Sequence, residues 1–369
     1  MSILLFIVIL LVLIVVHEYG HFIVAKKSGI RVDEFGIGFP PRAFTYMRKN
    51  GTDYTVNWLL FGGFVRIFGE NPNEESLTGP DSERSFSNKP KLIRAGVLVA
   101  GVVMNMLLAW VLLSAIFMVG TDIALDDTNI SDAQNVHLIV ADVFPGSPAE
   151  GTGLIPGDTI LSLRADGESA MTYTPEAIST FIAEHADEPF TMRVERGGED
   201  IEVTLSAEKG FAPGEPDRRV IGIAMGLVGH VQYLNPFKAL YEGGVLLKDL
   251  TVLVWNGLSH FFAGLLTFSA DFSEVAGPIG IVGVVGQAAG LGITSLLFLV
   301  ALISVNLAII NILPIPALDG GRLLFLLIEA FKGSPVDPKI ANRIHGIFFA
   351  LLIALILAVS YFDIARLIG

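Results

Sequence analysis

Two histidines and a glutamate lie in a stretch that otherwise reads as a membrane-spanning helix. His17 and His21 are four residues apart, so they lie one turn apart on one helix face, with Glu18 between them. This HExxH spacing lets both imidazoles bind one zinc ion and leaves the glutamate as general base. The apolar run extends from residue 3 to residue 25, where ionisable side chains are costly and usually functional. A chance match to HExxH is the alternative.

A third ligand has to come from elsewhere in the chain, because a hydrolytic zinc keeps three protein ligands and an open position for water. The chain has no cysteine, which leaves His, Asp or Glu. Asp319 is the best candidate because it follows an apolar span that two prolines break. Glu329 and Asp337 are weaker rivals, since they lie further toward water. An ordinary turn aspartate is the alternative reading of Asp319.

Four stretches are long and apolar enough to cross about 30 Å of hydrocarbon: residues 3–25, 92–119, 292–313 and 345–368. The mean hydropathy of the 369-residue chain is +0.62, which excludes an ordinary soluble protein. For the first stretch a cleaved signal peptide is the alternative, but its only nearby positive charges follow it. We expect a polytopic α-helical membrane protein with about four transmembrane helices. The helical segments would be 1–27, 92–120, 292–322 and 345–369, with a cytoplasmic loop over 323–344.

Positive charges orient these spans. Lys26-Lys27 follow the first span and are cytoplasmic by the positive-inside rule, so the N-terminus lies outside. The span 292–313 must also end on the cytoplasmic side if Asp319 is to reach the histidines. The stretch 237–268 is apolar but carries charged residues, so it could either span the membrane or lie at its surface. A single crossing would put Asp319 on the side opposite to the histidines, so the stretch must cross zero or two times. We therefore expect it to be interfacial or re-entrant, within a linker over 208–291.

The negative charge is concentrated in one region. Between Thr121 and Pro236 there are 20 acidic and 6 basic residues, a balance of −14, against −13 for the whole chain. After a linker over 121–134, residues 135–207 resemble a PDZ domain, because Pro156-Gly157-Asp158 leads into an apolar strand. We expect one inserted extracytoplasmic PDZ domain of α+β type, which binds an extended peptide at a sheet edge. A passive steric filter is the alternative. No basic stripe indicates nucleic-acid binding.

Residues 28–91 read as a β-rich, membrane-associated loop on the cytoplasmic side. Short strands are expected between Arg31 and Phe68, with Asn50-Gly51 as a hairpin turn. The glycines in these strands leave three interpretations open: the strands lie against the bilayer, they line a cleft, or they form a small structural sheet. Residues 70–90 read as a mobile loop. Asn105, in the second span, needs a partner in lipid, and we expect a structural interhelical bond. A contact with the helix that carries HExxH is the alternative.

Three features together resemble the site-2 protease family of intramembrane zinc metalloproteases, most closely its bacterial regulator-of-sigma-E type. They are HExxH in the first span, a PDZ-like segment between spans, and Asn311-x-x-Pro-x-Pro-x-Leu-Asp-Gly near the end. The resemblance covers essentially the whole chain. It implies Zn²⁺ bound by His17, His21 and Asp319, with Glu18 as general base. It also implies that Asn311 and a strand hold the substrate backbone, the strand residues being Gly36, Ile37, Gly38 and Phe39.

The activity that this resemblance implies is zinc-dependent cleavage of transmembrane segments in regulated intramembrane proteolysis. The substrates would be single-span proteins already cut by another protease, such as anti-sigma factors or signal-peptide remnants. The location would be the bacterial cytoplasmic (inner) membrane, with the active site toward the cytoplasm. Two alternatives come from other classes: a PDZ-bearing membrane adaptor with a non-catalytic zinc, and a transporter with a buried metal.

Overall fold

The chain divides into two compact units. The computed structural model describes residues 2–72, 74–124, 134–165, 168–170, 174–211, 218–231, 233–267, 277–334 and 336–368. One unit, here the membrane unit, comprises Met1–Ile116 and Phe237–Gly369. The other, the inserted unit, comprises Phe117–Pro236. Each is described by itself.

Four helices of the described chain are long and apolar enough to cross a membrane, and they lie where the four spans are predicted. They are α1 (Ser2–Lys27), α3 (Lys91–Val119), α8 (Ile293–Ile312) and the larger part of α10 (Pro338–Ile368). A helix suits these apolar runs because its backbone hydrogen bonds are internal, which lipid requires. The last helix begins earlier than predicted, at a proline that fits the first position of a helix.

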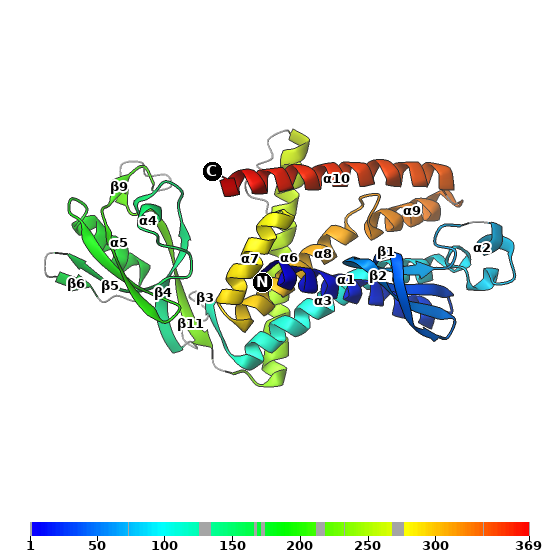
Figure 1. Cartoon of the computed structure of the whole chain (residues 1–369), viewed down its shortest axis with the longest axis horizontal. Coiled ribbons are helices and arrows are strands. Elements are labelled where there is room, and N and C mark those ends of the chain that lie inside the picture. The colour runs from blue at the N-terminus through cyan, green and yellow to red at the C-terminus, as the bar shows by residue number, and fades with distance from the viewer. Residues whose placement is uncertain are drawn as a thin grey trace. The chain divides into compact units, whose positions relative to one another are not determined.

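Glycines set how closely these helices approach one another. In Figure 1, α1 (dark blue) runs beside α3 (cyan), and a Cβ on Gly20 of α1 would lie 2.4 Å from the carbonyl oxygen of Ala100 on α3. A Cβ on Gly243 would lie 2.4 Å from Oγ of Ser114. Apolar helices in a membrane associate through close contact rather than the hydrophobic effect. These two glycines therefore determine where α1 and α6 (Pro236–Thr267) meet α3.

Residues 237–268, which we expected to be interfacial or re-entrant, lie almost entirely in helix α6. It is one uninterrupted helix, which excludes a re-entrant turn within it. It is also not among the four candidate spans of the described chain. An interfacial placement stays a prediction. The predicted linker further contains α7 (Pro278–Gly290), and the predicted loop 323–344 contains most of α9 (Asp319–Lys332).

The β-rich region is a long hairpin rather than several short strands. Strands β1 (Val32–Lys49) and β2 (Thr52–Ile67) meet at the predicted Asn50-Gly51 turn, where φ is 52° and 73°. Positive φ at both positions is the signature of a type I′ turn. Both strands bend, so that Phe35 pairs with Tyr54 and also with Val65. The bent hairpin is in effect a four-segment sheet in the order 42–49, 52–57, 32–37, 63–67.

Residues 70–90 carry short helices where the sequence predicted a mobile loop. These are α2 (Glu74–Thr78), η1 (Ser82–Arg84) and η2 (Phe86–Asn88), while residue 73 lies outside the described residues. Phe86 is buried in a cluster with Ile30 and Val97. The segment is therefore packed against α3 and the start of β1.

The inserted unit is built on an antiparallel sheet. Its strand order is β3-β11-β4-β5-β7-β8, with β6 paired to β5. The strands are β3 (Thr121–Ala124), β4 (Gln134–Val143), β5 (Thr159–Ala165), β6 (Glu168–Ala170), β7 (Phe190–Arg196), β8 (Glu199–Leu205) and β11 (Ile223–Val231). Two short strands, β9 (Glu208–Lys209) and β10 (Arg219–Val220), pair separately, and the helices are α4 (Pro148–Gly151) and α5 (Pro175–Glu184).

Two predicted boundaries of the inserted unit differ from the structure. Strand β11 pairs with β4, although the predicted domain ends at residue 207. Gly226 and Gly229 interrupt the apolar alternation of β11, which is why the sequence pattern is weak there. Of the predicted linker 121–134, the first four residues form β3, and residues 125–133 lie outside the described residues. The assignment as a PDZ domain stays a prediction.

Two aspartates pair with arginines on β7 in contrasting surroundings. The Asp158 side chain is fully buried and accepts two hydrogen bonds of 2.7 Å from Arg196 and one of 3.0 Å from the Ile155 N–H. These bonds raise the pKa of the Arg196 guanidinium. Asp200 pairs with Arg193, and about half of each side chain is exposed.

We predict that Asp158→Ala destabilises the inserted unit by about 2 kcal/mol, because the Ile155 N–H and the Arg196 guanidinium lose the buried acceptor that they share. Hydrogen exchange of residues 134–205 in the full chain measures the change. Asp200→Ala is the matched control and leaves exchange nearly unchanged, because solvent screens exposed pairs. Equal effects from the two variants would contradict the importance of burial.

Candidate metal centre

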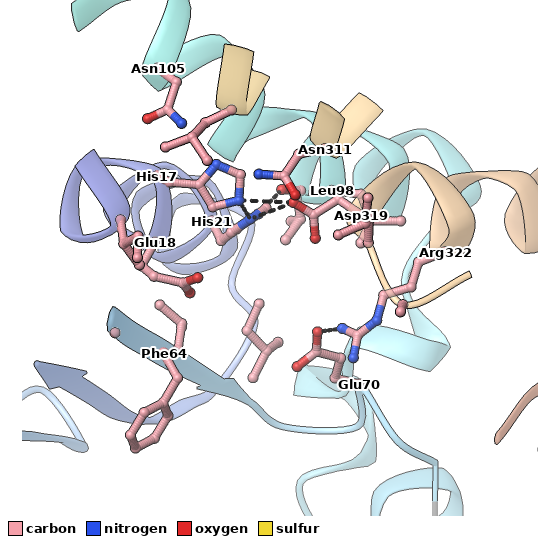
Figure 2. A pocket seen from close by; sticks show the side chains of 18 of the residues that line it. His17, Glu18, His21, Phe64, Glu70, Leu98, Asn105, Asn311, Asp319 and Arg322 are labelled. Atoms are coloured by element: carbon pink, nitrogen blue, oxygen red, sulfur yellow. Dashed lines mark hydrogen bonds and ion pairs between the residues drawn. The ribbon is translucent and has the colours of Figure 1, made fainter. Parts of the chain in front are cut away.

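Three predicted ligands meet at one point in the membrane unit. Nε2 of His17 lies 2.9 Å from Oδ2 of Asp319, Nε2 of His21 lies 3.2 Å from that oxygen, and the two Nε2 atoms are 3.1 Å apart. Figure 2 shows the two rings and the carboxylate pointing at one another. With zinc–ligand bonds of about 2.0–2.1 Å, ligand atoms of a tetrahedral site lie about 3.3 Å apart. The cluster therefore fits a single zinc ion.

The hydrogen bonding of His21 also suits a metal. Nδ1 of His21 lies 2.7 Å from the carbonyl oxygen of Val97, and donation to this oxygen leaves the Nε2 lone pair free for a cation. Two imidazoles and a carboxylate are ligand types that zinc takes.

The site lies in a cavity of about 470 Å³ within the membrane unit. The lining residues come from α1, the β-hairpin, the segment after it, α3, α8 and α9: Ile14, His17, Glu18, His21, Phe39, Gly63, Phe64, Val65, Ile67, Glu70, Phe86, Val97, Leu98, Asn105, Leu307, Asn311, Ala317, Leu318, Asp319 and Arg322. Two predicted residues, Glu18 and Asn311, thus face the same space as the cluster. Glu18 lies next to β2, because a Cβ on Gly63 would be 3.7 Å from its Cγ.

Room for the metal comes from a glycine on α3. A Cβ on Gly101 would lie 2.5 Å from Nε2 of His21 and 2.6 Å from Cε1 of His17. Both rings therefore rest against bare backbone at the position where the helices meet. The sequence pattern alone gives no sign that Gly101 lies against the imidazoles.

Two more glycines bring Asp319 to the site. A Cβ on Gly320 would lie 2.1 Å from the carbonyl oxygen of Leu313, and one on Gly321 would lie 2.4 Å from that of Ile315. The first turn of α9 is thus folded directly onto the Pro-x-Pro segment that ends α8. This contact explains why Asp319 is followed by two glycines.

The predicted substrate strand has its edges already occupied. Gly36 pairs with both Thr55 and Phe64, and Ile37 pairs with both Val56 and Gly63. These residues leave no free edge, and of Gly36, Ile37, Gly38 and Phe39 only Phe39 lines the cavity. The expectation is corrected for Gly36 and Ile37, whereas Phe39 pairs only with Leu59 in the described hairpin. Within the described strands, residues 63–67 also pair on one side alone, and all of them except Arg66 line the cavity.

Other polar groups of the cavity were missed or misread from the sequence. Arg322 forms an ion pair with Glu70, and Figure 2 shows this pair facing the metal cluster across the cavity. No sequence signal connects two residues so far apart. Asn105 was expected to make an interhelical bond, yet among the described residues its buried amide has no partner. Only its backbone carbonyl accepts a bond, from the hydroxyl of Ser304 at 2.8 Å.

The comparisons with known proteins agree with this chemistry. The model of peptidase family M50 matches residues 5–355. Zinc metalloprotease RasP of Geobacillus kaustophilus is 30% identical to this chain in an alignment 440 residues long. The alignment covers 99% of this chain and 98% of that protein. Membrane metalloprotease ARASP, chloroplastic, of Arabidopsis thaliana is 31% identical over 372 residues, which cover 96% of this chain and 77% of that protein.

We predict that Gly101→Ala abolishes high-affinity zinc binding, because the added methyl group occupies the space of both imidazoles. Gly96→Ala on the same helix is the control, since a Cβ there has nothing within 4 Å. Zinc per chain after dialysis, measured by atomic emission, distinguishes them. Stoichiometric zinc in Gly101→Ala would show that the rings do not rest against α3 as described.

Proposed function

The chain belongs to peptidase family M50 and is a zinc metalloendopeptidase of the membrane, and from this we propose that it cleaves peptide bonds inside the membrane. The observation that carries the proposal is the position of the ligand cluster. His17 and His21 are buried within α1, a helix apolar and long enough to span a membrane. A peptide bond that reaches this cavity is hydrolysed at membrane depth.

We assign His17, His21 and Asp319 as the zinc ligands. The fit of the distances between their ligand atoms supports the assignment. Bound there, zinc supplies Lewis acidity that polarises the scissile carbonyl and makes water acidic enough to lose a proton near neutral pH. Two helices far apart in the sequence must both be in place for the set to be complete.

Glu18 is the proposed general base. Its carboxylate lines the cavity beside the two histidines, between α1 and β2. From there it can take the proton of the attacking water and deliver it to the nitrogen of the leaving amine. A carboxylate placed one residue from a ligand on the same helix keeps a fixed distance to the reaction centre.

The substrate is proposed to bind as an extended strand. A transmembrane helix hides its amides in internal hydrogen bonds, so it must unwind before hydrolysis. The free edge of residues 63–67 offers backbone groups to which an extended peptide can pair. Asn311 lines the opposite part of the cavity and can bind the backbone of the same peptide. Phe39 remains a contact residue in this proposal.

The substrates are proposed to be single-span membrane proteins already shortened by another protease, of the anti-sigma-factor or signal-peptide-remnant type. The inserted unit is proposed to be an extracytoplasmic PDZ domain that takes a peptide ligand. The enzyme would lie in a bacterial cytoplasmic membrane, with its active site toward the cytoplasm. Family membership replaces the adaptor and transporter alternatives, because each relative described above is named as a metalloprotease.

We predict that Glu18→Gln lowers kcat by at least about 100-fold, while the variant still binds zinc, because only the proton acceptor is lost. Purified protein in detergent with a fluorescent single-span substrate measures the rate. Wild type treated with a zinc chelator should be inactive and recover with added zinc. Tyr19→Phe, one residue along and 43% exposed, is the control that keeps activity. Cleavage by Glu18→Gln at the wild-type rate would refute its role as base.

The proposed orientation has its own test. Because the chain has no cysteine, a single introduced thiol is the only target for a maleimide. We predict that a cysteine at Glu199, in the inserted unit, reacts with an impermeant maleimide in intact spheroplasts. A cysteine at Lys49, near the turn of the β-hairpin, should react only after permeabilisation. The reverse pattern would invert the topology.

A further inference from the structure

A strained residue sits two positions before Asp319. Ala317 has φ of 107°, in the left-handed region that a residue with a Cβ rarely adopts. Such a conformation persists only where surrounding contacts hold it. The backbone direction at Ala317 determines where α9 begins, and so where the Asp319 carboxylate lies.

The contact that holds Ala317 comes from another helix. Its N–H donates to Nδ1 of His345 on α10, at 2.9 Å. The neighbouring N–H groups of the turn bond within it, from Ile315 to the carbonyl of Leu313 and from Leu318 to that of Ile315. The amide of Ala317 is thus the point at which the turn is tied to a distant part of the chain.

His345 also contacts the helix that follows the turn. The centroid of its ring lies 5.3 Å from that of Phe325, which is on α9. The imidazole is therefore placed between the strained turn and the body of α9. In an apolar 18-residue stretch of α10 only 11% of the residues are buried, so this part of the helix packs little against the rest of the membrane unit.

We propose that His345 is a positioning residue for the zinc site. By accepting the Ala317 N–H it holds the strained turn, and the turn keeps Asp319 within ligand distance of His17 and His21. His345 touches none of these three side chains and acts through the backbone. The inference rests on the proposed role of Asp319 as a zinc ligand.

Two substitutions separate the hydrogen bond from the size and polarity of the side chain. His345→Asn keeps an acceptor near the position of Nδ1, whereas His345→Gln carries its amide one bond further out. Zinc affinity of the purified full-length protein is measured by competition with a chromophoric chelator. We expect His345→Gln to raise the zinc dissociation constant by about 10- to 100-fold, as loss of a ligand-supporting contact does, and His345→Asn to stay close to wild type.

Relief of the backbone strain gives the decisive comparison. Glycine adopts positive φ without steric cost, so Ala317→Gly should restore most of the zinc affinity lost in His345→Gln. The visible spectrum of the Co²⁺-substituted protein reports the ligand geometry. It should change in His345→Gln and return toward wild type in the double variant. A role of His345 in general stability alone would not predict this recovery.

Two further variants complete the test. Ile347→Ala, on the same helix and at a side chain 55% exposed, should bind zinc like wild type. Asp319→Asn should lose zinc affinity. Wild-type affinity in His345→Gln, or loss that Ala317→Gly does not relieve, would overturn the role of His345 while Asp319→Asn still behaves as a ligand variant. Unchanged affinity in Asp319→Asn would instead overturn the ligand assignment, and the inference with it.

Discussion

The meeting of two imidazoles and a carboxylate is the interaction on which the membrane unit depends. His17, His21 and Asp319 are costly in apolar surroundings unless each has a partner. Their ligand atoms lie about 3 Å apart, and this convergence joins α1 to the start of α9 across about three hundred residues of sequence. In the proposed assignment, a zinc ion bound here would satisfy the carboxylate and both imidazole lone pairs, and so stabilise the structure as well as supply the chemistry.

Close backbone contact makes that convergence possible. Gly20 lets α1 touch α3, Gly101 leaves room for both rings, and Gly320 with Gly321 folds α9 onto the end of α8. A side chain at any of these positions would separate the elements that carry the ligands. In lipid little else drives helices together. The accuracy of the site therefore depends on residues that have no functional group.

The same cavity combines rigid and adaptable parts. The ligand helices are held by backbone contacts, whereas the edge at residues 63–67 has unused pairing capacity. The proposed hydrolysis of a membrane segment would need both properties, since the proposed ligands must stay fixed while the substrate exchanges its helical hydrogen bonds for those of a strand. The ion pair of Glu70 with Arg322 lines the same cavity.

Local patterns were sufficient for much of this description. Apolar runs identified the four spans, because a helix is what lipid demands of such segments. The Asn50-Gly51 turn, the HExxH pair and the Asp319 candidate also followed from spacing and residue type. Each depends on neighbours within a few residues, and that information is written directly in the sequence. The same holds for β5 of the inserted unit, the apolar strand that follows Asp158.

Features that depend on distant partners came only from the tertiary structure. The pairing of β11 with β4, the occupied edges of Gly36 and Ile37, and the position of Gly101 against the imidazoles have no local signature. Nor does the bond from Ala317 to His345, which joins a strained turn to the last helix. The physical reason is common to all of them. The role of each of these residues depends on which distant part of the backbone packs against it. The packing of the whole unit determines that contact.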